Sequence, residues 1–459
     1  MIVSMSSELA ELRDAAPGAR LITDPDQMES YRRDQTPVVT PGRPRAVLLA
    51  SSTEHVAAAL AWAQRHRVPV VPRGGGTSLA GGATATDGCL VLSTARMTSV
   101  RELDAANEIA VAEAGVFNAD LDRAAAKHGL MYAPDPSSYE IATIGGNVAT
   151  NAGGLRCVKY GVTRDSVLGL EVVLPGGRVL QTGRRTMKGV TGYDLTGLFV
   201  GSEGTLGVIT SATLRLRPRP ATYPVTVAAG FASFAAGAEA VTSILAARIR
   251  PSLLELMDSA TLRAIDQFKS TGFGDDIKAL LIAQDDGESA DRSGERIREL
   301  SLAAGALMAE VSASEDESRQ LLELRRLGYP AIERLGVPLV EDVCVPRTRL
   351  PEMVARIEAT AVRHNVYIAT VAHAGDGNLH PVFVFERGLP EVPPAVWAAA
   401  DEVFRAALEL GGTLTGEHGV GMIKRRWLGD ELSPVSMAVH HAIKNALDPD
   451  GIMNPGKVL

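Results

Sequence analysis

Three runs of small residues constrain this 459-residue chain more than any other feature. They are PRGGGTSLAGG at 72–82, PDPSSYEIATIGGNVATNAGG at 134–154 and GSEGTLGVIT at 201–210. Runs without large side chains pack a core poorly, but they let the backbone approach a flat or extended ligand. A tight turn is the alternative for any single run. Three runs in one half of the chain favour a ligand surface.

The first run follows an apolar, strand-like segment at 68–71, and its exposed N–H groups could cradle a phosphate. The two common phosphate loops do not fit. Leu79 stands where the dinucleotide fingerprint requires glycine, and Gly82 stands where the Walker loop requires lysine. The sequence therefore argues against both a Rossmann and a Walker phosphate site.

Charge and composition exclude several classes of protein. Lys plus Arg is 46 and Asp plus Glu is 54, which gives a net charge of −8 and disfavours a nucleic-acid binder. Aromatic residues are only 4%, which disfavours a base-stacking platform. Hydrophobic residues are 46%, enough for a large core.

Cysteine usage and hydropathy suggest where the protein works. The three cysteines, Cys89, Cys157 and Cys344, form no CxxC pair, and their odd number argues against a disulfide framework. They also form no iron–sulfur cysteine cluster. We find no signal-peptide pattern and no apolar stretch long enough to span a membrane. We expect a cytoplasmic protein, with peripheral membrane contact through a partner left open.

Periodicity predicts an α+β chain in three parts: a helical lead-in at 1–40, one domain at 41–219 and a second at 220–459. In the first domain we expect strands at 46–50 and 68–71, helices at 53–67 (capped by Thr53) and 117–129, and a hairpin at 170–183. In the second we expect an antiparallel or mixed sheet with helices on one face. That domain also contains a helix at 315–335 and a hairpin at 366–386.

Three of the nine histidines lie outside helical surface patterns: His373, His380 and His418. If Asp376–Gly377 is a two-residue hairpin turn, His373 and His380 are directly opposite and share a face. A packed histidine pair is the simpler interpretation, because two histidines lack a third ligand. GEHGVG at 416–421 offers Glu417 as that ligand, since its glycines allow a bent backbone.

The glycine runs, together with YGVTRDSVLGLEVVLPGG at 160–177, resemble the flavin-binding domain of the vanillyl-alcohol oxidase / p-cresol methylhydroxylase superfamily. HAGDGNLHP at 373–381, GEHGVG and NPGK at 454–457 resemble the C-terminal domain of FAD-linked oxidases. That domain occurs in D-lactate dehydrogenases, the catalytic glycolate oxidase subunit and D-2-hydroxyglutarate dehydrogenase. The resemblance extends from about residue 40 to the end of the chain.

The resemblance implies a p-cresol-methylhydroxylase-type FAD domain followed by an α+β, ferredoxin-like substrate and cap domain. It places the FAD pyrophosphate on the 73–82 loop. Some members of the superfamily attach FAD through a histidine just after this loop. This chain has Thr77 and Ser78 there, so we expect non-covalent FAD. The implied FAD-binding residues are Arg73, Gly74, Gly75, Gly76, Thr77, Ser78, Gly81, Pro134, Asp135, Ser137, Thr143, Gly145, Gly146, Asn147, Ala149, Gly153, Glu203, Gly207, Ile209 and Asn454.

In the resembling dehydrogenases two histidines and a glutamate hold a divalent metal, and the next histidine is the base. Carried over, the ligands are His373, His380 and Glu417, and the catalytic base is His418. This N/O ligand set suits Zn²⁺ or Mn²⁺. The implied reaction converts a D-2-hydroxy acid into a 2-oxo acid, with hydride transfer to flavin N5.

The resemblance also places a substrate carboxylate at Arg325. D-2-hydroxyglutarate dehydrogenase has Thr and Lys where this chain has Tyr329 and Val340. A second carboxylate would therefore lack partners here, so we favour D-lactate or glycolate, with Tyr329 and Val340 lining an apolar pocket. The alternatives are D-2-hydroxyglutarate, another alcohol, or a non-catalytic flavin subunit. An external acceptor is needed: a quinone, a cytochrome, an electron-transfer flavoprotein or a partner subunit. A homodimer is compatible with the family.

Overall fold

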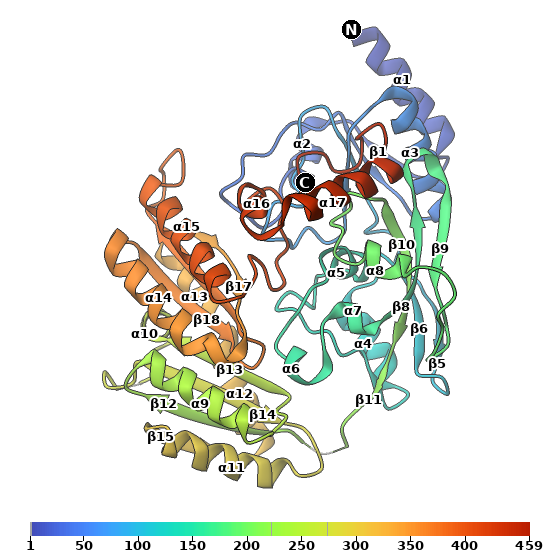
Figure 1. Ribbon diagram of the computed structural model, residues 1–459. Coiled ribbons are helices and arrows are strands. Elements are labelled where there is room, and N and C mark those ends of the chain that lie inside the picture. The colour runs from blue at the N-terminus through green and yellow to red at the C-terminus, as the bar shows by residue number, and fades with distance from the viewer. Residues whose placement is uncertain (1, 222, 273) are drawn as a thin grey trace. The chain divides into compact units, whose positions relative to one another are not determined.

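The computed structural model describes residues 2–221, 223–272 and 274–459 (Figure 1). Its described residues form two compact units. The first contains the residues up to Gly153, Val162–Arg219 and Glu417–Leu459, and the second contains Gly154–Gly161 and Pro220–Gly416. The C-terminal segment Glu417–Leu459, which we expected in the second domain, therefore packs with the first unit.

A four-stranded sheet opens the first unit, in the order β1-β2-β4-β3. Strands β2, β4 and β3 are parallel, and β1 is antiparallel to β2. The strands are β1 (Arg20–Ile22), β2 (Ala46–Leu49), β3 (Val70–Arg73) and β4 (Leu90–Ser93). Helix α3 (Thr53–His66) connects β2 to β3. The hydroxyl of Ser52 accepts the N–H of His55 and caps α3, so our prediction that Thr53 is the cap is wrong by one residue.

The second sheet of this unit is antiparallel, in the order β5-β6-β10-β8-β9. The predicted hairpin at 170–183 is confirmed, because β8 and β9 pair from Val173↔Val179 to Gly169↔Gly183. A short antiparallel pair, β7 with β11, lies outside this sheet. The strands are β5 (Val100–Asp104), β6 (Ile109–Glu113), β7 (Leu130–Met131), β8 (Val167–Val173), β9 (Val179–Gly183), β10 (Val208–Arg215) and β11 (Arg217–Pro218).

Most helices of the first unit are short. The elements not predicted from the sequence include β1, which interrupts the helical lead-in, and α5, which lies within a glycine-rich run. The helices besides α3 are α1 (Ile2–Ala15), α2 (Pro25–Met28), α4 (Asn118–Ala126), α5 (Ile144–Thr150), α7 (Thr163–Ser166), α8 (Leu195–Phe199), α16 (Leu428–Glu431) and α17 (Pro434–Leu447). Buried apolar side chains of α3, β2 and β4 form one core, and those of β6, β8 and β10 form another.

The second unit is built on an eight-stranded sheet in which neighbouring strands are antiparallel. Its main order is β15-β12-β14-β13-β18-β19-β16, and β17 pairs with β19. The first four strands have the 4-1-3-2 order of a ferredoxin-like unit. The strands are β12 (Val225–Phe231), β13 (Leu253–Asp258), β14 (Ala279–Asp285), β15 (Ala306–Val311), β16 (Val337–Val340), β17 (Val343–Cys344), β18 (Tyr367–His373) and β19 (Asn378–Phe385).

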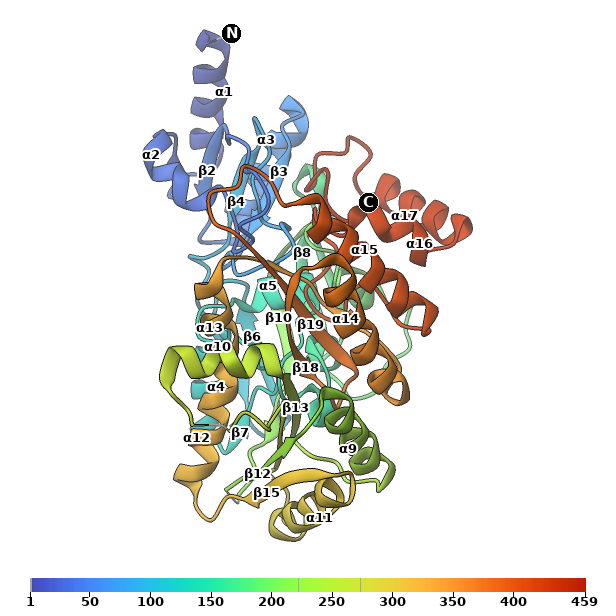
Figure 2. The same cartoon turned by 90° about the vertical axis from the view of Figure 1, so that its left-hand side faces the viewer.

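Helices cover both faces of this sheet, not one face as we expected. Figure 2 shows α10, α12 and α13 on one side and α9, α11, α14 and α15 on the other. The burial pattern agrees with this: every residue of β13 and β14 is buried, as in a strand covered on both faces. The helices are α6 (Cys157–Tyr160), α9 (Phe234–Ala246), α10 (Ser259–Lys269), α11 (Ala290–Ala303), α12 (Glu315–Arg326), α13 (Gly328–Leu335), α14 (Leu350–His364) and α15 (Pro394–Glu409).

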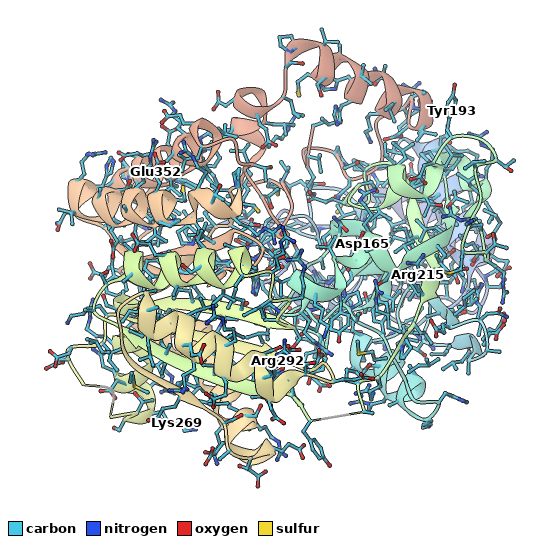
Figure 3. The ribbon with its side chains drawn as sticks, turned by 60° about the horizontal axis from the view of Figure 1, so that its bottom comes forward. Asp165, Tyr193, Arg215, Lys269, Arg292 and Glu352 are labelled. Carbon is cyan, nitrogen blue, oxygen red and sulfur yellow. The ribbon has the colours of Figure 1, made fainter. Side chains whose placement is uncertain are left out.

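Two details of the second unit concern its helices. The helix predicted over 315–335 is broken at Leu327 into α12 and α13. Pro330 explains the break, because it has no N–H to continue the helical ladder and it restricts the residue before it. The charged side chains of Arg292 on α11 and Glu352 on α14 remain exposed (Figure 3).

Candidate functional site

The glycine loop after β3 lies directly against the 134–154 run. A Cβ atom added to Gly74 would lie 2.3 Å from Oγ1 of Thr143, and one added to Gly75 would lie 2.4 Å from the carbonyl oxygen of Ile141. Gly76 has a φ of +70°, a conformation that side chains disfavour. Glycine is therefore required here by backbone contact as well as by turn geometry.

The third run joins the same region through Glu203. A Cβ on Gly82 would lie 3.3 Å from Oε2 of Glu203, and the N–H of Glu203 donates to the carbonyl of Ala149 at 2.7 Å. The three small-residue runs therefore meet within the first unit, as a shared ligand surface requires.

This region fits a flat, extended cofactor. Thr143 caps α5 by accepting the N–H of Gly146, and Gly145 packs so closely that a Cβ would lie 2.6 Å from Cβ of Ala114. Asn147 is 4% exposed, and its Nδ2 has no hydrogen-bond partner among the described residues. A buried amide donor without a partner is costly, which indicates that a ligand satisfies it.

Other predicted cofactor residues hold loops in place. Nη1 of Arg73 donates to the carbonyl of Arg33 at 2.9 Å, and Nδ2 of Asn454 donates to the carbonyls of Gly82 and Glu203 at 2.9 and 2.7 Å. Burial lowers the pKa of Arg73, and the neighbouring Asp34 opposes this shift. Direct FAD contact by these side chains stays a prediction.

The remaining predicted cofactor residues lie in the same unit. Thr77, Ser78 and Gly81 continue the glycine loop, and Gly207 packs against β8, where a Cβ would lie 2.8 Å from Cγ1 of Val172. Ile209 is a buried residue of β10. Pro134, Asp135 and Ser137 lie in the segment after β7, and Gly153 is buried.

Glu203 anchors the segment that carries the predicted base, His418. Oε1 of Glu203 accepts the N–H of Val420 at 2.8 Å, and Oε2 accepts the N–H of Gly421 at 2.9 Å. Burial raises the pKa of Glu203 to about 7, although these two hydrogen bonds oppose the shift. Nε2 of His418 lies 3.8 Å from Oε1 of Glu417.

The hairpin of β18 and β19 has a different register from the one predicted. Its turn contains four residues, 374–377, so His373 pairs with Asn378, and His380 pairs with Val371. The predicted pairing of His373 opposite His380 is therefore wrong by two residues. Because a shift of two residues preserves the face, both histidines still lie on one face as diagonal neighbours. Their ring centroids are 4.9 Å apart, edge to face.

A buried acid that was not predicted from the sequence lies beside this pair. Oε1 of Glu255, in β13, is 2.7 Å from Nδ1 of His373. Its Oε2 accepts a hydrogen bond from Nε of Arg325 at 2.7 Å and also forms an ion pair with Nη2 of Arg325, 2.7 Å away. Glu255, His373 and Arg325 are 1%, 4% and 7% exposed. The detectable signal was an acid inside the apolar run LLELM of β13, because a charged residue is rarely buried without a partner.

Gly416, the residue before Glu417, is held closely within the second unit. The N–H of Gly416 donates to Oδ2 of buried Asp342 at 2.6 Å. A Cβ on Gly416 would collide with Nδ2 of Asn378, the ladder partner of His373. Each of His373, His380 and Glu417 offers one ligand atom, and these atoms lie within 4.8 Å of one another. The donor set fits a divalent cation such as Zn²⁺.

The predicted substrate residues lie on three elements of the second unit. Arg325 is the buried partner of Glu255, at the end of α12. Tyr329 is half-buried on α13, where burial and then Glu333 raise its pKa to about 12. Val340 ends β16 and is buried. An apolar pocket lined by Tyr329 and Val340 stays a prediction.

Among the described residues, no helix combines the length and the hydropathy that a membrane span requires.

The family comparisons match both halves of the chain. Residues 44–183 match the FAD binding domain family, and residues 221–458 match the family described as FAD linked oxidases, C-terminal domain. The chain is 42% identical over 431 residues to the glycolate oxidase subunit GlcD of Bacillus subtilis (strain 168), which covers 93% of this chain and 91% of the relative. It is 33% identical to a D-lactate dehydrogenase of Anaerostipes hadrus, covering 98% and 96%.

Solved structures with low sequence identity to this chain have the same fold. p-Cresol methylhydroxylase superposes with a TM-score of 0.81 at 18% identity, covering 100% of this chain and 97% of that one. An alkyldihydroxyacetonephosphate synthase gives a TM-score of 0.75 at 19% identity, covering 98% and 84%. These likenesses confirm the expected fold class. The chain belongs to the FAD-linked oxidase family, with a p-cresol-methylhydroxylase-type FAD-binding domain followed by the C-terminal domain of that family.

Proposed function

We propose that this protein is an FAD- and metal-dependent dehydrogenase that oxidises a D-2-hydroxy acid, D-lactate or glycolate, to the 2-oxo acid. The observation that carries the proposal is the cluster of His373, His380 and Glu417, whose ligand atoms lie within 4.8 Å of one another. The relatives named as a glycolate oxidase subunit and as D-lactate dehydrogenases support the substrate class.

His373, His380 and Glu417 would hold the cation, and the three glycine runs would hold FAD without a covalent bond. A divalent cation supplies Lewis acidity toward a hydroxyl oxygen, and FAD supplies a hydride acceptor. His418 would take the hydroxyl proton on its imidazole ring. The 2-oxo acid would form when the hydroxyl proton is held by His418 and the C2 hydrogen is taken up, as hydride, by the acceptor that FAD would supply.

The residues around His418 fix where that proton acceptor lies. Glu203 holds the backbone of Val420 and Gly421, and the N–H of Met422 donates to the carbonyl of Ala80 at 2.8 Å. His418 is thus attached to the same glycine loop that is expected to bind FAD. A base on a rigid segment keeps its geometry at little entropic cost.

The contacts of Arg325 bear on how many carboxylates the substrate carries. One edge of its guanidinium, Nε and Nη2, is already paired with Glu255. A second substrate carboxylate would compete with Glu255 for this edge, and Val340 offers it no charge. This arrangement supports a monocarboxylate over D-2-hydroxyglutarate.

The electron acceptor would be external to this chain: a quinone, a cytochrome, an electron-transfer flavoprotein or a partner subunit. The three cysteines do not suffice for a four-cysteine iron–sulfur cluster of its own. We also propose a cytoplasmic location with peripheral contact at the membrane, and a homodimer as a candidate assembly.

Anaerobic flavin reduction tests the proposal. Purified protein carrying FAD and Zn²⁺ or Mn²⁺ is mixed separately with D-lactate, L-lactate, glycolate and D-2-hydroxyglutarate. We expect D-lactate or glycolate to bleach the flavin band and L-lactate to leave it unchanged. Bleaching by D-2-hydroxyglutarate at a comparable rate would contradict the monocarboxylate assignment.

Two histidine variants distinguish loss of the proposed metal site from a general loss of structure. In His373→Ala the flavin band should persist but should be reduced at least about 100-fold more slowly, since loss of a ligand weakens binding of the cation. His441→Ala alters an exposed histidine on α17 and should behave like the unaltered protein. Equal reduction rates in both variants would remove His373 from the mechanism.

A further inference from the structure

We propose that Glu255 is a positioning residue that presents His373 to the metal, with Arg325 as its buried counter-charge. This inference rests on the proposed metal site. It goes beyond it by assigning a role to a strand residue that is neither a ligand nor a substrate contact. The juxtaposition is a chain of three groups: the guanidinium of Arg325, the carboxylate of Glu255 and the imidazole of His373.

The two oxygens of Glu255 have separate partners. Oε1 lies 2.7 Å from Nδ1 of His373. Oε2 accepts the Nε–H of Arg325 at 2.7 Å and lies 2.7 Å from Nη2 of the same guanidinium. Each distance is in the range of a charge-assisted hydrogen bond. The carboxylate therefore cannot rotate toward one partner without losing the other.

The strand and helices explain why this carboxylate is fixed. Glu255 is the third residue of β13, and its strand pairs with β14 on one side and with β18 on the other. Glu255 is 1% exposed, so its side chain has little room for another rotamer. Arg325 reaches it from the last turn of α12, and Ser314 caps the other end of that helix.

Burial makes the charge balance necessary. A carboxylate removed from water without a cation would cost several kcal/mol, so the pairing with Arg325 is what makes Glu255 tolerable. The pair is close to neutral and leaves His373 beside a hydrogen-bond acceptor. A neutral substitute for Glu255 would remove the carboxylate that faces His373, and one for Arg325 would leave that carboxylate without its cation.

The contact with Glu255 selects a tautomer. An ionised carboxylate only accepts hydrogen bonds, so Nδ1 of His373 must carry the proton. The lone pair of the neutral ring then lies on Nε2, which is the nitrogen that could bind a cation. A carboxylate behind a ligand histidine also fixes the ring orientation and raises its basicity.

The same contacts change the role that we assign to Arg325. The resemblance assigned it to a substrate carboxylate, but its Nε–Nη2 edge serves Glu255. Only Nη1 lies outside this contact and could reach a substrate. Loss of Arg325 should therefore weaken metal binding as well as substrate binding.

Metal titration of the FAD-loaded protein tests the proposal. The bound cation is removed with a chelator, and Zn²⁺ is titrated in competition with a chromophoric chelator. We expect Glu255→Gln to weaken Zn²⁺ binding about 10- to 100-fold, with the FAD content unchanged. Glu255→Asp, which keeps the charge, should recover part of this loss.

A second readout reports the tautomer directly. In protein labelled with ¹⁵N-histidine, two-bond ¹⁵N–¹H correlations should show His373 protonated at Nδ1 in the metal-free state. Glu255→Gln should increase the fraction protonated at Nε2. Assignment uses the loss of one spin system in His373→Gln.

Asp258→Asn is the matched control. Asp258 is another buried acid of β13, and it accepts the N–H groups of Thr261 and Thr370 instead of a histidine. Its loss should lower stability but leave Zn²⁺ affinity within about twofold, because it does not orient a ligand. Equal weakening in Asp258→Asn and Glu255→Gln would mean that the effect is general loosening and would overturn the inference.

Two outcomes distinguish this inference from the proposed function. If the unaltered protein binds no Zn²⁺ or Mn²⁺, the metal-dependent function fails. If it binds the cation and Glu255→Gln binds it equally well, or His373 is protonated at Nε2, the function survives and the role of Glu255 is refuted.

Discussion

The glycine runs of the first unit and the charged cluster of the second unit solve different physical problems. Near Gly74 and Gly75 the backbone is left bare, because a Cβ atom would strike Thr143 or Ile141. Around Glu255 the opposite holds: full-length side chains are buried and satisfy one another. The first region leaves room for the proposed FAD, and the second fixes the orientation of His373, a proposed metal ligand.

The difference predicts which kind of substitution will disturb each region. A surface lined by backbone is sensitive to added volume, because close-packed atoms must move to accept it. A buried charge cluster is sensitive to the loss of one member, because the remaining charge has no water to replace its partner. Variants in the two regions should therefore respond to opposite kinds of substitution.

Arg325→Met should produce the greatest loss of stability. It leaves Glu255 buried without its cation, which should lower the free energy of unfolding by about 3–5 kcal/mol. Urea unfolding, with hydrogen exchange of peptides from β13 and β18, measures the effect. Arg319→Met is the control on the same helix: its pairs with Glu315 and Asp316 are exposed, so it should cost at most about 1 kcal/mol.

The two Arg variants also test whether a buried ion pair matters more to stability than exposed ones. Comparable losses for Arg319→Met and Arg325→Met would show that burial of the Glu255 pair is energetically irrelevant. Adding Glu255→Gln to Arg325→Met should restore part of the stability, because no uncompensated charge remains.

Glu203 should make the first unit less stable as pH rises. Burial raises its pKa to about 7, above its ordinary value of 4.5. A raised folded-state pKa contributes stability that is present below pH 4.5 and is lost as pH rises through 7, which amounts to about 3 kcal/mol for the full shift. Thermal unfolding of Glu203→Gln between about pH 4.5 and 7.5 should show a flatter dependence than the unaltered protein.

Glu402 in the second unit should show the opposite sign. Burial favours a higher pKa, but hydrogen bonds from His364, Thr360 and Arg363 outweigh it and lower the pKa to about 2. Its contribution is present above pH 4.5 and is lost as pH falls toward 2. If Glu402→Gln removed stability only at the acidic end of this window, and none at neutral pH, the sign would be wrong.

Gly75→Ala should selectively damage the first unit's ligand surface. The new methyl group would lie 2.4 Å from the backbone carbonyl of Ile141, and overpacking of this kind costs about 1–3 kcal/mol. We expect FAD affinity to fall about 10- to 100-fold in titrations of the flavin-free protein. Gly429→Ala, where no atom lies within 4 Å, should leave FAD affinity unchanged.

Helix caps should give small and uniform effects. Ser52 caps α3 in the first unit, and Ser314 caps α12 in the second. Ser→Ala at either position should cost about 1 kcal/mol, and Ser→Gly only a few tenths. Unequal costs, measured by urea unfolding, would mean that one cap is coupled to its neighbouring site.

The sequence was most informative about the positions where only glycine fits. Glycine leaves a visible mark in a sequence, so the three runs could be linked to one ligand surface before their contacts were known. The histidine face was also predictable, because a register error of two residues does not change it. Local signals failed at α5, which is formed by the glycine-rich segment Ile144–Thr150 and packs its Gly145 closely against Ala114 of another segment.

The charged cluster was less predictable for a physical reason. Glu255 and His373 are 118 positions apart, and nothing local reveals that β13 and β18 are neighbours. Arg325 was selected through the resemblance, but its partner in the structure is Glu255. The role of Glu203 was similarly hidden, because its hydrogen bonds to Val420 and Gly421 join segments 217 and 218 positions apart.

If the proposed mechanism is right, this chain reduces bound FAD with a D-2-hydroxy acid only when a divalent cation is present. The rate of anaerobic flavin bleaching by D-lactate and by glycolate tests this directly, in FAD-loaded protein before chelation, after chelation and after Zn²⁺ or Mn²⁺ is restored. We predict rapid bleaching, then loss with the flavin band intact, then recovery. Bleaching at an unchanged rate in verified metal-free protein would refute the metal-dependent mechanism.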